Sequence, residues 1–72
     1  MENSDIDINL LIDKYEQMRY MNQSIYFDPD EFALLADYYN DFGDVSEADY
    51  IVELGLQIHP QHSHLMIVKA KI

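Results

Sequence analysis

Three histidines within six residues form the densest group of possible metal ligands in the chain. They are His59, His62 and His64 in the segment HPQHSH, and neutral imidazole is a good ligand for zinc, copper and nickel. Pro60 interrupts the group, and because a proline ends a preceding helix, the three rings share no helical face. We therefore expect turn and cap residues on the surface here, keep the histidines only as weak metal candidates, and expect no cofactor.

Acidic residues are the second group with possible chemistry, and they dominate the charge of the chain. Fourteen Asp and Glu residues outnumber four Lys and Arg residues, which gives a formal net charge of −10. The acidic clusters at residues 28–31 and 41–47 lack the loop of about twelve residues, with a central glycine and a terminal glutamate, that binds calcium. This charge disfavours unaided binding to nucleic acid or to an anionic membrane, because both are negative themselves.

Helix capping explains the acidic residues better than catalysis does. Asp28 and Glu31 lie three residues apart, as do Asp44 and Glu47, which is the spacing of a capping box. The sequence has no cysteine, and its serines occur in no nucleophile motif such as Gly-x-Ser-x-Gly. Acid–base catalysis by paired carboxylates also needs a water-excluding cleft, for which so short a chain has little room. We therefore expect no enzyme.

Helical periodicity runs through most of the chain and predicts an all-α fold of about four helices. Apolar residues recur at intervals of three and four, which is the period of one helix face. The predicted helices span residues 5–21, 29–42, 45–58 and 63–71. The stripes expected to be buried are Ile8, Leu11, Ile12, Tyr15 and Met18 in the first helix, Phe32, Leu35, Ala36 and Tyr39 in the second, and Ala48, Ile51, Val52, Gly55 and Ile58 in the third. No apolar run reaches about 18 residues, so no membrane span is expected and a cytoplasmic location follows by default.

Local start and stop signals divide the middle of the chain into two antiparallel helices. Asp28, followed by proline, suits the start of a helix, and Phe27 can pack on Phe32 across that start. Gly43 is placed to end this helix in a left-handed conformation. Gly55 lies inside the next helix, where glycine costs roughly 1 kcal/mol relative to alanine, so we expect a packing reason for it.

The predicted hairpin resembles one copy of the tetratricopeptide repeat. That family has a large aromatic residue, Leu, a small residue, Tyr, Ala, a second aromatic residue and a closing Pro at fixed spacings over about 34 residues. The matching positions are Phe32, Leu35, Ala36, Tyr39, Ala48, Val52 and Pro60. The departures are Phe for Trp, Ala for Gly, and Val for the second aromatic residue. The resemblance covers about half of the chain and implies antiparallel hairpins of an α-solenoid.

The resemblance predicts a single tetratricopeptide-like domain over residues 1–72. Residues 5–21 are expected to form an N-terminal capping helix, and residues 29–62 a complete repeat. Residues 63–72 are expected to form the first helix of a truncated second repeat, without the partner helix that a repeat provides.

The last segment is apolar nearly all round, so we expect it to leave an apolar packing end exposed. The residues assigned to this end are Leu65, Met66, Val68 and Ile72. An exposed apolar patch usually marks an interface. Self-association, or continuation of the repeat array, is therefore expected here.

Tetratricopeptide proteins generally bind other proteins in a groove lined by the first helix of each repeat. The resemblance thus implies a non-catalytic protein–protein interaction module, the N-terminal part of a helical-repeat scaffold or adaptor. The implied groove residues are Asp30, Ala33, Asp37, Asn40 and Asp41. Because this face is largely acidic, we expect a basic or polar partner segment. The alternative is an acidic decoy that inhibits a nucleic-acid-binding protein, although the acidic residues ring the helices instead of lining one face.

Overall fold

The computed structural model describes residues 7–24 and 26–72, and within them it consists of four α-helices without a strand. The helices are α1 (Ile8–Met21), α2 (Pro29–Asp41), α3 (Val45–Ile58) and α4 (Ser63–Lys71). The predicted all-α fold is therefore confirmed for the described residues. No helix in this part of the chain is both long enough and apolar enough to cross a membrane.

The helix boundaries follow the local sequence signals, with small differences. The side chain of Asp7 accepts a backbone hydrogen bond in the first turn of α1 at 3.0 Å, so Asp7 is the N-cap and α1 begins at Ile8. The predicted start at residue 5 lies outside the described residues. α2 ends at Asp41, one residue earlier than predicted, with Phe42 as its C-cap.

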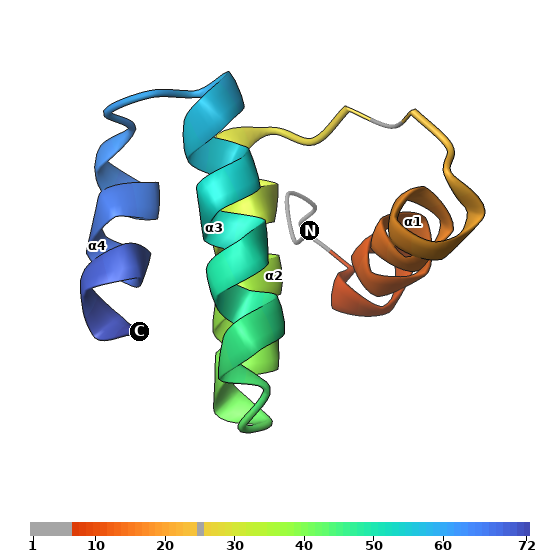
Figure 1. Cartoon of the computed structure of the whole chain (residues 1–72), viewed down its shortest axis with the longest axis horizontal. Coiled ribbons are helices and arrows are strands. Elements are labelled where there is room, and N and C mark those ends of the chain that lie inside the picture. The colour runs from red at the N-terminus through yellow and green to blue at the C-terminus, as the bar shows by residue number, and fades with distance from the viewer. Residues whose placement is uncertain (1–6, 25) are drawn as a thin grey trace, which may run out of the picture.

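α2 and α3 form a hairpin joined by a tight turn at Gly43 (Figure 1). Gly43 has a φ of 86°, in the left-handed region that favours glycine. Its N–H donates to the carbonyl of Asn40 at 3.0 Å, and the N–H of Asp44 donates to the carbonyl of Tyr39 at 2.9 Å. This pair of bonds is a Schellman motif, which satisfies carbonyls at the end of α2 and turns the chain back.

The predicted capping box is present at the start of α2 but only half formed at the start of α3. The N–H of Asp28 donates to the carboxylate of Glu31 at 2.8 Å. At α3, the carboxylate of Asp44 accepts from the N–H of Glu47 at 3.2 Å. The carboxylate of Glu47 accepts hydrogen bonds from Tyr15 and Arg19 of α1 instead of from the N–H of Asp44.

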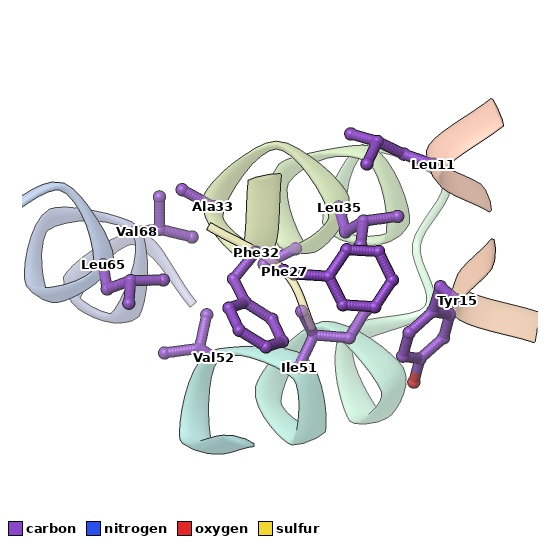
Figure 2. Packing of buried hydrophobic residues seen from close by; sticks show 11 residues of the cluster. Leu11, Tyr15, Phe27, Phe32, Ala33, Leu35, Ile51, Val52, Leu65 and Val68 are labelled. Carbon is purple, nitrogen blue, oxygen red and sulfur yellow. The ribbon is translucent and has the colours of Figure 1, made fainter. Parts of the chain in front are cut away.

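The core lies within the hairpin and between the hairpin and its two outer helices. α1 lies on one flank of the hairpin and α4 on the other (Figure 1). Figure 2 shows the buried side chains that fill this space. The buried apolar residues are Leu11, Tyr15, Phe27, Phe32, Ala33, Leu35, Ala36, Ala48, Ile51, Val52, Leu65 and Val68. The rings of Phe27 and Phe32 pack edge-on with centroids 5.4 Å apart, which confirms the predicted contact across the start of α2.

The predicted buried stripe of α3 is confirmed as far as Gly55 and is wrong at Ile58. Gly55 is buried against Phe32 and Leu65, so its lack of a side chain has the expected packing reason. Ile58 is exposed in the last turn of α3, where it lines an open pocket.

The packing of α4 corrects the predicted exposed end. Leu65 and Val68 are buried and point toward the hairpin (Figure 2), and Ile72 is half-buried against the core. Their spacing of three and four residues places them on one face of the helix. Met66 is exposed as predicted, and Ile67, which the sequence analysis did not select, is exposed as well.

Candidate functional site

The groove predicted on α2 is only partly exposed. Ala33 is fully buried on the side that faces α4 (Figure 2), so its assignment to the groove is wrong. Asn40 is half-buried, whereas Asp41 is exposed. Ala33 and Asp37 are four residues apart and share the flank of α2 on which α4 packs. The predicted residues therefore divide between a covered flank and an exposed outer side.

Two acidic residues of the predicted groove pair with basic side chains of α4. The carboxylate of Asp30 lies 3.0 Å from Nδ1 of His64, and that of Asp37 lies 3.0 Å from Nζ of Lys71. Pairs this close to solvent contribute little to stability, from about 0 to 1 kcal/mol. The charge of Asp37 is nevertheless partly compensated by Lys71, so Asp37 attracts a partner less strongly than an unpaired carboxylate would.

The outer side of α2 carries exposed Leu34, half-buried Tyr38 and exposed Asp41, and it continues onto Phe42. The first three lie at i, i+4 and i+7, which places them on one side of the helix. The rings of Tyr38 and Phe42 are 4.7 Å apart between centroids, and 72 % of Phe42 is exposed. Asp30 lies one turn before Leu34 on the same side. We call these five residues the α2 face: an apolar and aromatic strip with a carboxylate near each end.

Aromatic contacts continue from the α2 face toward α1. The ring of Tyr38 lies edge-on to that of Tyr39, with centroids 5.3 Å apart, and the ring of Tyr39 lies 5.7 Å from that of Tyr15. Burial, followed by the nearby negative charge of Glu16, raises the pKa of Tyr39 to about 12. This ring therefore stays neutral and acts as a packed support for the α2 face.

A cluster around Glu47 fastens α1 to α3. The hydroxyl of Tyr15 donates to the carboxylate of Glu47, and Nε of Arg19 donates to the same oxygen at 3.2 Å. The guanidinium of Arg19 also lies 4.3 Å from the ring centroid of Tyr50. Burial, together with the hydrogen bond to Glu47, raises the pKa of Tyr15 above its usual range. A phenol that holds its proton so firmly is a poor base at neutral pH, so the cluster is structural.

The spacing of Glu47 from Asp44 predicts a capping role only, and this cluster was not predicted. Tyr15 and Arg19 lie about thirty residues earlier in the chain. Only the folded arrangement of α1 across the hairpin brings them to Glu47. The available signal was the capping-box spacing, which is local and carries no information about a distant partner.

The three histidines do not converge on a common point. His64 pairs with Asp30, and Nε2 of His59 lies 3.3 Å from the carbonyl oxygen of Phe27. Nδ1 of His62 is buried without a hydrogen-bond partner among the residues that the structure describes. In residues 7–24 and 26–72, no group of three His, Cys, Asp or Glu side chains is arranged to hold a metal ion.

An open pocket of about 550 Å³ lies beside the C-terminal ends of α1 and α3. Its lining residues are Met18, Asn22, Gln23, Ser24, Tyr26 and Ile58. Tyr26 is the only titratable residue among them. The pocket therefore offers no pair of groups for acid–base or nucleophilic chemistry.

Comparisons of the chain with protein-family models, with curated proteins and with solved structures find no match. The tetratricopeptide resemblance therefore rests on the sequence positions that carry it and stays a prediction.

Proposed function

We propose that this chain is a non-catalytic protein–protein interaction module that binds a basic segment of a partner on the α2 face. One observation carries the proposal: exposed Leu34, half-buried Tyr38 and exposed Phe42 follow one another along α2 and its C-cap, with carboxylates near both ends. Interfaces commonly combine an aromatic and apolar centre with a polar rim. Tyrosine and other large side chains at the centre supply most of the binding energy.

Charge favours a basic partner for this face. The net charge of −10 attracts basic segments from a distance and raises the rate of association. Asp41 is exposed beside Tyr38 and Phe42. A lysine or arginine placed over these rings gains about 0.5–1 kcal/mol from the cation–π contact at an exposed site. The same cation can pair with the carboxylate of Asp41.

The packing of α4 supports the further proposal that this chain belongs to a helical-repeat scaffold or adaptor. α4 contacts both α2 and α3 and so adds one more helix to the flank of the hairpin. Solenoids grow by adding helices to a flank in this way. The decoy alternative has less support, because the acidic residues cap helices or pair with basic residues of α4.

Asp41→Lys tests the α2 face with little damage to the fold. Asp41 is exposed at the C-terminal end of α2, where a positive charge suits the helix dipole. Asp37→Lys is less suitable, because it also breaks the pair with Lys71. We expect Asp41→Lys to weaken binding of a fluorescent peptide rich in lysine and arginine about fivefold, which corresponds to roughly 1 kcal/mol.

Asp13→Lys is the matched control, because it makes the same change in net charge on the exposed side of α1. Fluorescence anisotropy measures the peptide affinity of both variants and of the parent chain. We expect Asp13→Lys to weaken binding clearly less than Asp41→Lys. Equal losses would mean that only the net charge matters, and the α2 face would then be the wrong site.

A further inference from the structure

The α2 face contains a continuous ridge of the kind with which helices pack on one another. Four of its residues lie at successive intervals of four: Asp30, Leu34, Tyr38 and Phe42. Rows with this spacing form ridges that fit into the grooves of a second helix. Phe42 is the C-cap of α2, so the ridge runs along nearly the whole helix. It therefore offers a second helix a surface of matching form.

Charge on this side of the hairpin favours a basic helix. α2 contains four acidic residues and no lysine or arginine. Asp41 is exposed, and the side chain of Asp30 is 67 % exposed although it lies beside His64. Lys71 of α4 also approaches α2, where it pairs with Asp37. Asp30 and Asp41 thus stay accessible to a basic partner near the two ends of the α2 face.

The spacing of these two carboxylates separates a helical partner from an extended one. Asp30 and Asp41 are eleven residues apart, which is about three turns and about 16 Å along the helix axis. A second helix that crosses α2 at about 20° runs alongside it and can meet both carboxylates with basic residues that are also about eleven positions apart. In an extended segment, about 16 Å corresponds to about five residues, and side chains five positions apart point to opposite sides.

Resting on the function proposed above, we infer that the partner segment is an amphipathic helix with basic residues at positions i and i+11 and apolar residues at i+4 and i+7. Its basic residues pair with Asp30 and Asp41, and its apolar residues cover Leu34 and Tyr38. Amphipathic helices are commonly recognised through apolar residues at such intervals. The partner is thus defined by its helical form and by the spacing of its charges as well as by their sign.

Three peptides of identical composition test this form. The first has lysine at i and i+11, leucine at i+4 and i+7, one proline in its first turn, and alanine and glutamine elsewhere. The second differs in that both lysines are moved to the opposite side of the helix. The third differs from the first in that the proline lies at the centre, where it breaks a helix, whereas the first turn tolerates it. Fluorescence anisotropy measures their affinities, and circular dichroism checks their helix content.

We expect the first peptide to bind about fivefold more tightly than either of the others, as two ion pairs near solvent would provide. Leu34→Ala should weaken its binding clearly more than Leu10→Ala, which makes the same change at an exposed position of α1. Binding of an unstructured peptide rich in lysine and arginine, without a preference among these three, would overturn the helical partner alone. A failure of all four peptides to bind would overturn the proposed function as well.

Discussion

A methyl group added at Gly55 would lie 3.1 Å from Cβ of Phe32 and 3.2 Å from Cδ1 of Leu65. These atoms belong to the core side of α2 and α4, so they have little room to move. Replacing glycine by alanine inside a helix normally stabilises by roughly 1 kcal/mol, but overfilling a packed core costs about 1–3 kcal/mol. We expect the second effect to win and Gly55→Ala to lower the free energy of unfolding by about 1 kcal/mol.

Urea denaturation followed by circular dichroism measures this difference. Gln57→Ala is the control, because Gln57 is exposed in the same helix and its replacement changes helix propensity without touching the core. The control should change stability by only a few tenths of a kcal/mol. If Gly55→Ala is more stable than the parent chain, the close contact of α2, α3 and α4 at this point is looser than the distances indicate.

Tyr15 and Tyr39 make the stability of the fold sensitive to alkaline pH. Folding raises the pKa of both phenols, chiefly through burial. The unfolded chain therefore loses these protons above about pH 10, where the folded chain still holds them. Because the unfolded state then binds fewer protons, the free energy of unfolding falls as the pH rises above about 10. For Tyr39 this loss continues to about pH 12.

Tyr15→Phe removes the hydroxyl and keeps the buried ring, so it isolates the contribution of the hydroxyl to stability. At neutral pH, it removes the hydrogen bond to Glu47, and a bond to a charged group is worth roughly 1.5–3 kcal/mol. Above about pH 10, the variant has one phenol fewer to ionise, so its stability should fall less steeply with pH than that of the parent chain. Urea denaturation across this pH range measures both effects, with Tyr26→Phe as an exposed control. Parallel pH profiles for parent and Tyr15→Phe would contradict the raised pKa of Tyr15.

At the scale of elements, α4 is held by apolar burial more than by its ion pairs. Leu65 is fully buried, and truncating such a residue to alanine costs about 2–5 kcal/mol. Lys71 pairs with Asp37 near solvent, so Lys71→Met should cost at most about 1 kcal/mol. We expect Leu65→Ala to lower the urea midpoint several times more than Lys71→Met does. Comparable losses would mean that charge pairing docks α4.

The helix boundaries were predictable because their signals are local. Asp28 and the proline after it start α2, Gly43 ends it, and Pro60 follows the last turn of α3. Each of these residues acts on its own backbone within one turn, so the sequence alone carries the information. Leu65 was placed wrongly because its burial depends on which flank of the hairpin α4 covers.

The candidate site was predictable only in part, for the same reason. Asp41, which was assigned to the groove, is exposed, whereas Ala33, which was assigned to it as well, is covered by α4. Leu34 and Tyr38 were missed, although their spacing from Asp41 places all three on one side of the helix. The cluster at Glu47 could not be predicted, because its partners come from α1, which is far from Glu47 in the sequence.

At the scale of the whole molecule, the two outer helices support the hairpin that carries the α2 face. α1 is fastened near the turn of the hairpin by the cluster at Glu47, and α4 packs on the opposite flank (Figure 1). A chain of this length buries only about 60 % of its unfolded surface, so each of these contacts matters for a rigid binding surface. The central claim is that this surface receives a basic segment at Leu34, Tyr38, Asp41 and Phe42.

The most direct measurement is a titration of isotope-labelled protein with a peptide rich in lysine and arginine, followed by amide NMR. We expect saturable shifts that are largest at the α2 face, that weaken as salt screens the charges, and that are absent with an acidic peptide of equal length. A titration without shifts, or one whose largest shifts lie on α1 or α4 while the α2 face stays unchanged, would contradict the claim.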